Sequence, residues 1–200
     1  MHKFLYISIL VVVFLLTGCT QKALEIDVSE SMYRPTKISK IDINSLNITN
    51  KAESGEFINT LLFSDTIIPI GPDTPTDELV EDDIKTFFSN YQLTKDSKKV
   101  LNVYITNADA YVVWGGAQKI PIVGLLFVAA DTDYVMNLRV IFEIEENGKV
   151  LNSYQFNDKI KIRHSAAVEE SIVEGYQLLI KTYRRKLFNE LENRFINRYI

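Results

Sequence analysis

The sequence contains few of the residues that usually carry chemistry. Its 200 residues include one cysteine, Cys19, and two histidines, His2 and His164. A single cysteine excludes an intramolecular disulfide and any metal site built from several thiolates. With one histidine outside the N-terminal segment, a Ser-His-acid site could use only His164. We therefore expect no enzyme activity, no metal and no cofactor.

The chain also lacks an excess of positive charge. It has 22 lysines and arginines against 26 aspartates and glutamates, a formal charge of −4. Nucleic acids attract clustered basic side chains, so we do not expect nucleic acid as a partner. The only compact basic cluster is Arg184–Lys186. It has two interpretations: a solvated helix face, or a docking face for an acidic partner or lipid head groups.

Long apolar runs are limited to two segments, and the first opens the chain. Lys3 precedes an uncharged stretch, Phe4–Leu16, which is the layout of a secretory signal. This stretch is shorter than the roughly 20 residues of a membrane-spanning helix. The tetrapeptide LTGC, Leu16–Cys19, follows at once and resembles the lipobox of bacterial lipoproteins.

The resemblance to a lipobox implies a specific maturation. Cys19 would carry a diacylglyceryl thioether, the chain would be cut between Gly18 and Cys19, and the new amino group would usually be acylated. Several acyl chains anchor a protein stably to a membrane. The alternative is a buried cysteine in an uncleaved signal anchor. The residue after the cysteine, Thr20, is not the aspartate of inner-membrane retention, so we expect the outer membrane, facing the periplasm, if the host is Gram-negative.

These signals divide the chain into three parts. Residues 1–18 are predicted to be the lipoprotein signal peptide, and residues 19–35 the acylated cysteine with a polar tether. Residues 36–200 are predicted to form a single α+β periplasmic domain, since their number suffices for one hydrophobic core.

Two segments have the spacing of amphipathic helices. The first runs from about Pro75 to Tyr91, with Thr74 as its expected N-cap and Pro75 in its first turn. The second begins after Ser165 and continues for nearly thirty residues. Its apolar stripe consists of Val168, Ile172, Tyr176, Leu179, Ile180, Tyr183, Leu187, Leu191 and Phe195. A helix of this length should exceed the sheet beneath it, so we expect its last two turns to overhang, kink or contact something else.

Strand periodicity dominates between the two helices. Apolar and polar residues alternate from Leu101 toward Val113 and again from Tyr134 to Ile144, where the opposite face is polar. Weaker strand patterns occupy residues 37–48 and 55–63, and the latter could also be helical. The order of strands, helix, strands and helix predicts a two-layer α+β domain, with an antiparallel or mixed sheet and both helices packed on one face.

The turn in the sequence ENGK, residues 146–149, determines how the last two strands pair. A two-residue loop would place Ile144 opposite Leu151 and divide the apolar residues of the partner strand between two faces. A three-residue loop with Gly148 in the left-handed region would place Ile144 opposite Val150, and the apolar faces would coincide. We therefore predict the three-residue loop.

Polar residues offer few candidates for a site. His164, between a strand and a helix, has the position of a cap or surface residue. Asp131 and Asp133 could offer two carboxylates to a hard cation, but the sequence supplies no third ligand and no calcium-type loop. The pair Gly115–Gly116 matches neither a Walker motif nor a dinucleotide fingerprint.

The second apolar run, KIPIVGLLFVAAD, covers Lys119–Asp131 and is too short to span a membrane as a helix. It has two interpretations. GLLFVAA could be a strand buried on both faces, or the run could form a hairpin that faces a partner or dips into the membrane. The second interpretation predicts a partner or ligand surface made of Trp114, Ile120, Ile122, Leu125, Leu126 and Phe127.

The lipobox, the strand VLNVYITNADAYV, the hairpin ADTDYVMNLRVIFEIEENGK and the closing helix together resemble the YajG-type small periplasmic lipoproteins. Auxiliary lipoproteins of envelope ABC transport systems are similar in strand and helix order. The resemblance covers about residues 101–195, and the glycine-rich apolar insert departs from the YajG-type pattern. Only Cys19 can be carried over from it, as the acylation site.

The sequence thus favours a non-enzymatic accessory or assembly subunit of a cell-envelope complex. It would be held at the membrane by the lipid on Cys19 and would bind an envelope protein partner. The alternative is a carrier of lipid or a small ligand, with an apolar pocket between the long helix and the sheet.

Overall fold

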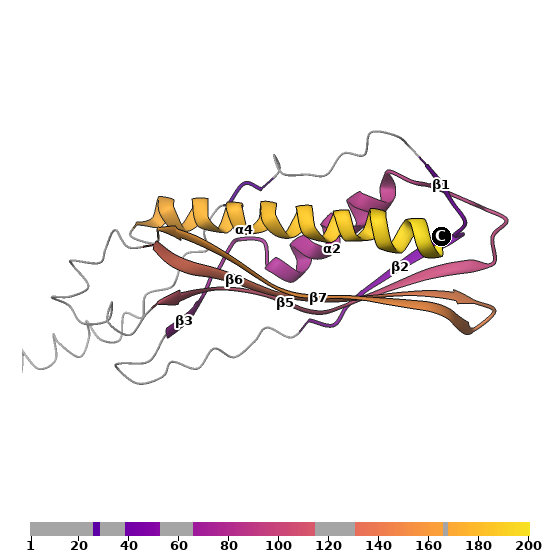
Figure 1. Ribbon diagram of the computed structural model, residues 1–200, viewed down its shortest axis with the longest axis horizontal. Helices are drawn as coiled ribbons and strands as arrows, with labels where there is room; N and C mark the ends of the chain where they lie inside the picture. Colours follow the sequence, from indigo (N-terminus) through magenta and orange to yellow (C-terminus); the bar gives the residue numbers. More distant parts are fainter. Residues whose placement is uncertain (1–25, 29–38, 53–65, 115–130, 166–167) are drawn as a thin grey trace, which may run out of the picture.

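The computed structural model describes residues 26–28, 39–52, 66–114, 131–165 and 168–200. Three long strands form the centre of the fold and follow one another as an antiparallel meander (Figure 1). They are β5 (Lys99–Trp114), β6 (Asp131–Glu146) and β7 (Lys149–Ser165). The two strands that the alternation of apolar and polar residues predicted are therefore confirmed, although a register shift between Ile105 and Asn107 interrupts the alternation in β5.

Two shorter strands complete the sheet along the outer side of β5. Strand β2 (Ser45–Asn50) is parallel to the first half of β5, and β3 (Thr66–Pro69) is antiparallel to its second half. A separate two-residue pairing joins β1 (Lys40–Ile41) to β4 (Gln92–Leu93). The sheet is thus mixed, in the order β2-β5-β6-β7, with β3 beside β5.

Both helices lie on the same face of the sheet (Figure 1). They are α2 (Thr76–Ser89) and α4 (Glu169–Glu190), and the latter continues through a π-helix, η3 (Leu191–Ile196), into the short α5 (Asn197–Tyr199). The predicted two-layer α+β class, with a mixed sheet and helices on one face, is confirmed.

The start of α2 lies one residue later than the prediction. Pro75 is the N-cap, with φ −52° and ψ 142°, and no side chain caps the helix. The extended ψ of Pro75 keeps it outside the helix, so Thr74 does not reach the cap position and the predicted N-cap is wrong. Thr76 then begins the helix with its side chain buried.

The hairpin between β6 and β7 corrects the predicted register. Asn147 and Gly148 form a two-residue loop with φ of 52° and 78°, so the predicted three-residue loop is wrong. Both residues adopt the left-handed region that a type I′ turn requires, and Asn-Gly is the favoured pair for it. A register shift after Glu145 then places Ile144 opposite Asn152, with Leu151 as the extra residue.

This bulge explains why the apolar faces still coincide. A two-residue loop alone would turn β7 over, because a slip of one residue exchanges the two faces of a strand. The extra residue at Leu151 restores the alternation, so that Phe142 lies opposite Tyr154 and Val140 opposite Phe156. The predicted coincidence of apolar faces is thus confirmed for Tyr154 and Phe156, whereas Val150, predicted to face Ile144, lies opposite Glu145 and is exposed.

The C-terminal helix does not outrun the sheet. Strands of 16 and 17 residues are about 55 Å long, whereas the residues from Glu169 to Tyr199 give a helical length of about 47 Å. The expectation of an overhang assumed shorter strands and is wrong. In η3, Leu191 and Phe195 are both buried, and the ring of Phe195 lies 5.3 Å from Phe142 and 5.7 Å from Tyr154. The wider π turn keeps these residues, spaced by four, directed at the sheet.

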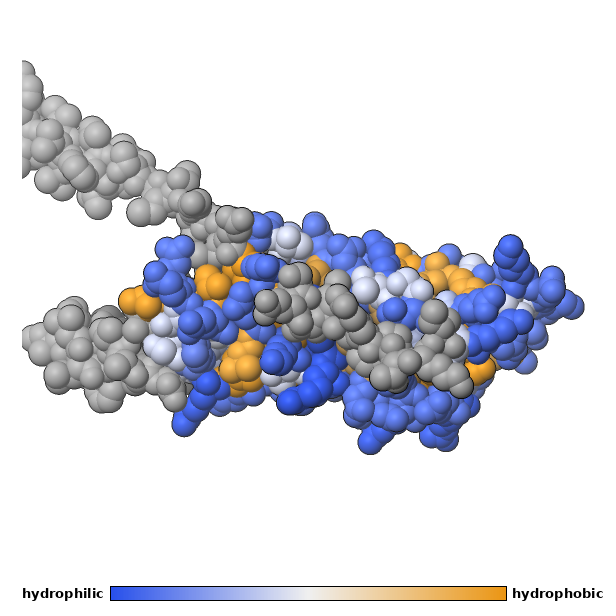
Figure 2. Space-filling model, turned by 90° about the horizontal axis from the view of Figure 1, so that it is seen from above, coloured by the Kyte–Doolittle hydropathy of each residue, from blue (hydrophilic) through white to orange (hydrophobic). Residues whose placement is uncertain are grey.

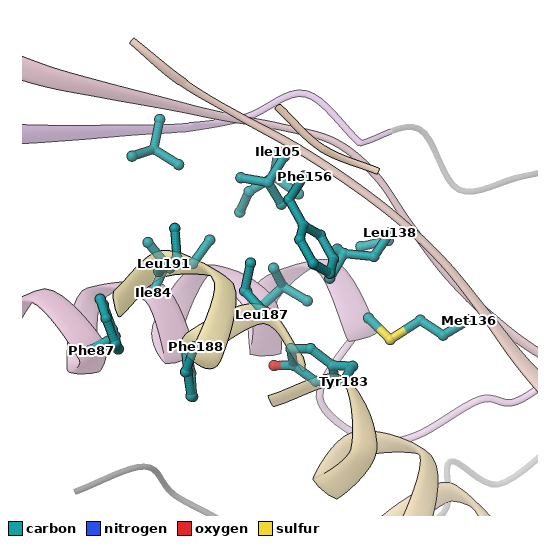
Figure 3. Close-up of a cluster of buried hydrophobic side chains, with 14 of the residues drawn as sticks. Ile84, Phe87, Ile105, Met136, Leu138, Phe156, Tyr183, Leu187, Phe188 and Leu191 are labelled. Carbon is teal, nitrogen blue, oxygen red and sulfur yellow. The ribbon is translucent and has the colours of Figure 1, made fainter. Parts of the chain in front are cut away.

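The core fills the space between the helix layer and the sheet (Figure 3). From the helices come Ile84 and Phe87 of α2 and Leu187 and Phe188 of α4, with the rings of Phe87 and Phe188 stacked at 5.1 Å. The sheet contributes Ile105, Met136, Leu138 and Phe156. The opposite, outward side of the helix layer is mainly hydrophilic with scattered apolar patches (Figure 2).

Candidate functional site

Most residues of the two predicted sites lie outside the described residues. This holds for Gly18 and Cys19 and for Ile120, Ile122, Leu125, Leu126 and Phe127. Trp114 ends β5, where its backbone pairs with Thr66. The acylation site and the apolar partner surface therefore stay predictions, and so does the division of the chain into signal, tether and domain.

The structure divides the basic cluster Arg184–Lys186 among three environments. Arg184 is 2% exposed and lies in the core, whereas Arg185 is exposed. Lys186 donates to Asp158 of β7 at 2.8 Å. The cluster is neither a uniformly solvated face nor a continuous docking face, because its first member is directed at α2.

Arg184 forms a buried, bidentate ion pair with Asp83 of α2. Its Nε donates to Oδ2 and its Nη2 to Oδ1 of Asp83, both at 2.7 Å. Burial raises the pKa of Asp83 to about 6, although the hydrogen bonds and charge of Arg184 oppose this shift. The carboxylate is therefore mainly ionised at neutral pH and is matched by the planar guanidinium.

The same guanidinium also holds the start of the described chain. Nη1 of Arg184 donates to the backbone carbonyl of Val28, and Nε2 of Gln177 donates to that of Asp27 at 2.6 Å. Ile26 is buried as part of the core. Arg184 thus connects three segments that are distant in sequence: residues 26–28, α2 and α4. We call Asp83, Arg184 and the Val28 carbonyl the buried clamp.

The sequence contained a signal for this clamp that the prediction did not use. Asp83 falls on the apolar stripe of α2, next to Ile84 and one turn after Val80. Arg184 likewise follows Tyr183 on the apolar stripe of α4. A charged residue on the buried face of a helix requires a partner. Two such residues of opposite charge, on two predicted helices, therefore predict an ion pair between them.

Two buried tyrosines of α4 differ in how their hydroxyl groups are satisfied. The hydroxyl of Tyr176 shares a hydrogen bond of 3.0 Å with Oγ1 of Thr76, and burial raises the pKa of Tyr176 to about 12. The hydroxyl of Tyr183 is buried without a hydrogen-bond partner among the described residues. Its position beside Leu187 and Phe188 is shown in Figure 3.

Removing each hydroxyl should therefore change stability in opposite directions. We expect Tyr183→Phe to raise the free energy of unfolding by about 1 kcal/mol, because it removes an unsatisfied buried polar group. Tyr176→Phe should lower it by about 1 kcal/mol, because Thr76 would lose its partner. Urea titrations of the two variants test this, and equal effects would contradict the assignment of partners.

The remaining polar candidates form polar contacts at the surface. Nε2 of His164 lies 3.2 Å from Oε2 of Glu174. Asp133 pairs with Lys161 at 2.6 Å and with Arg163 at 3.4 Å. In the part of the chain that the structure describes, no three metal-ligating side chains come together. Asp133 is thus bound to cations of the neighbouring strand.

A groove of about 420 Å³ lies between β7 and the C-terminal half of the long helix. On the strand side it is lined by the consecutive residues 154–158, and on the helix side by Lys186, Asn189, Glu190 and Arg194. Two contacts cross from strand to helix here: the Tyr154 hydroxyl donates to Glu190 at 3.0 Å, and Lys186 binds Asp158. Glu190 is also paired with Arg194 at 3.2 Å.

The interior between the long helix and the sheet is filled by protein side chains. Leu179, Ile180 and Leu187 of α4 are fully buried, as are Met136 and Val140 of β6. A carrier would hold an apolar ligand in this space, and that alternative stays a prediction.

None of the described helices has the length and apolar character needed to cross a membrane.

No protein-family model matches the sequence, and no curated protein matches it. Several solved structures match this chain at low identity. A Xanthomonas campestris protein of the DUF330 family matches with 10% identity over 78% of this chain and 87% of its own, at a TM-score of 0.41. A Helicobacter pylori protein described as a homolog of neuraminyllactose-binding hemagglutinin matches with 11% identity, 84% and 97% coverage, and a TM-score of 0.39. Rare lipoprotein B from Shewanella oneidensis matches with 10% identity, 74% and 91% coverage, and a TM-score of 0.35.

Proposed function

We propose that this protein is a lipid-anchored lipoprotein of the cell envelope that acts as a non-enzymatic accessory or assembly subunit. The observation that carries the proposal is the sequence LTGC, which follows an apolar core of signal-peptide length and contains the only cysteine of the chain. In a Gram-negative host the protein would be attached to the outer membrane and face the periplasm.

The contacts of residues 26–28 support a body held close to its anchor. Ile26 is buried against the core and lies seven residues after Cys19. A fully extended chain of seven residues spans at most about 25 Å. An acylated Cys19 would therefore hold the folded body within roughly this distance of the membrane surface, where it can contact a membrane-bound partner.

Cys19→Ser tests the anchor directly. We expect the variant to lose incorporation of radiolabelled palmitate and to leave the membrane fraction, because serine supplies no thiol for the thioether. Fractionation and palmitate labelling of cells that produce the full chain measure both effects. Thr20→Ser is the matched control and should keep both. Palmitate incorporation into Cys19→Ser would overturn the lipoprotein proposal.

The accessory role is tested with the same cells, which produce the wild-type chain or Cys19→Ser. Detergent extracts of the envelope should yield a stoichiometric protein partner with the wild-type chain, and less of it with Cys19→Ser, because that variant is no longer concentrated at the membrane. Recovery of the wild-type protein alone, under several detergents, would argue against an accessory subunit while leaving the lipid anchor standing.

A further inference from the structure

Strand β7 forms the edge of the sheet on the side away from β2 and β3. It pairs with β6 along one side, and on its other side the structure describes no strand. β7 is 17 residues long and contains no proline. An edge strand of this length presents unpaired backbone N–H and C=O groups, which can pair with an additional strand.

The groove between β7 and the long helix runs along this edge. Its strand side consists of five consecutive residues, 154–158. Consecutive residues of a strand point to opposite faces, so a groove that contacts all five lies beside the backbone and not over one face. An extended polypeptide in the groove would therefore be positioned to pair with β7.

The charges of β7 differ from those of the whole chain. The strand carries four basic residues and one acidic residue, whereas the chain has a formal charge of −4. The acidic residue, Asp158, is bound to Lys186 on the helix side. Beyond the groove, Lys159 is exposed on the outward face, in line with Lys161 and Arg163. These last two share the single carboxylate of Asp133.

We propose that the edge of β7 from Tyr154 to Lys161, with which no described strand pairs, binds an extended acidic segment of a partner protein, which adds a strand to the sheet. Backbone hydrogen bonds would supply affinity, and carboxylates at alternate positions of the segment would face Lys159 and Lys161. This inference deepens the proposed accessory function and rests on it.

A second copy of this chain fits the edge less well. The outward face of β7 contains no acidic residue, so the β7 of another copy would offer no carboxylate to Lys159, Lys161 or Arg163. Lysines on an edge strand disfavour such self-pairing, because like charges repel. An acidic segment would not be repelled in this way.

The test uses the full chain in detergent at low salt and two fluorescent eight-residue peptides. In one, glutamate alternates with valine, and in the other, glutamine replaces glutamate. We expect the glutamate peptide to bind more tightly and to protect the amides of residues 154–161 from hydrogen exchange.

Lys159→Glu should weaken the binding of the glutamate peptide about tenfold, because an attractive pair of charges becomes a repulsive one. Lys181→Glu, an exposed lysine of α4 outside the groove, is the matched control and should change binding less than twofold.

Charge reversal in the peptide keeps the test independent of any folding defect of the variant. A peptide with lysine at the glutamate positions should bind Lys159→Glu more tightly than the wild type. Equal binding of the glutamate and glutamine peptides, or protection elsewhere than β7, would overturn the proposal. So would β7 protection that depends on protein concentration, which indicates a second copy, or protection by phosphatidylglycerol vesicles alone. Failure here leaves palmitate labelling and partner recovery untouched, so the two proposals are judged separately.

Discussion

Arg184→Met is expected to lower the free energy of unfolding by about 4 kcal/mol, since removing one member of a buried ion pair leaves the other charge without compensation. Asp83 is fully buried, and both of its carboxylate oxygens accept hydrogen bonds from Arg184. The variant also removes the donor to the Val28 carbonyl, so hydrogen exchange should increase at residues 26–28. Urea titration and hydrogen exchange measure the two effects.

Neighbouring and conservative variants separate the clamp from a general loss of charge. Arg185→Met removes a cation one residue away on an exposed position, and its effect should stay within about 0.5 kcal/mol. Arg184→Lys keeps the positive charge but not the planar guanidinium. We therefore expect it to lower the free energy of unfolding by most of the amount expected for Arg184→Met. Equal stability of Arg184→Met and Arg185→Met would show that the buried clamp contributes nothing.

Gly175→Ala should destabilise the protein by about 2 kcal/mol, although glycine to alanine inside a helix normally stabilises it by about 1 kcal/mol. A Cβ atom at Gly175 would lie 2.5 Å from Cε1 and 2.8 Å from Cε2 of Tyr134. This ring cannot easily move away, because its hydroxyl donates to the carbonyl of Ser165 at 2.7 Å. Urea titration of the variant measures the effect.

Gly71→Ala is the control for this substitution. Apart from Gly71 and its two chain neighbours, no described residue has an atom within 4 Å of a Cβ placed at Gly71, so alanine there should change the free energy of unfolding by less than about 0.5 kcal/mol. Combining Gly175→Ala with Tyr134→Leu should cost less than the sum of the two single changes, because the smaller side chain relieves the contact. A stabilising effect of Gly175→Ala would show that the ring can shift at little cost.

The elements with strong periodicity were predictable from the sequence. The alternation from Tyr134 to Ile144 gave both the existence of β6 and the face it buries, and the spacing of apolar residues predicted α2 and the long helix. The details of the β6–β7 turn could not be predicted, because a two-residue loop and a β-bulge occur together there. The Asn147–Gly148 loop and the extra residue Leu151 each shift the register by one, and a pattern of faces alone cannot separate their contributions.

The candidate sites show a similar division. The clamp depends on residues 101 positions apart, so neither Asp83 nor Arg184 reveals its partner locally, although each interrupts an apolar stripe. The groove beside β7 depends on the strand order, which places β7 and not β5 at the edge. Composition and periodicity do not fix that order, and the predicted partner surface from Trp114 to Phe127 was drawn from local apolar character alone.

The short turn between β6 and β7 also bears on how the chain folds. Asp133 and Arg163, near the open end of this hairpin, are only 30 residues apart, whereas Asn47 and Asn102 of the parallel pairing are 55 apart and the clamp joins residues 101 apart. The entropy lost on closing a loop grows with the length of the loop. The strands of the hairpin can therefore pair before the distant contacts form. Loss of the Arg184 contact should then accelerate unfolding and leave the folding rate almost unchanged.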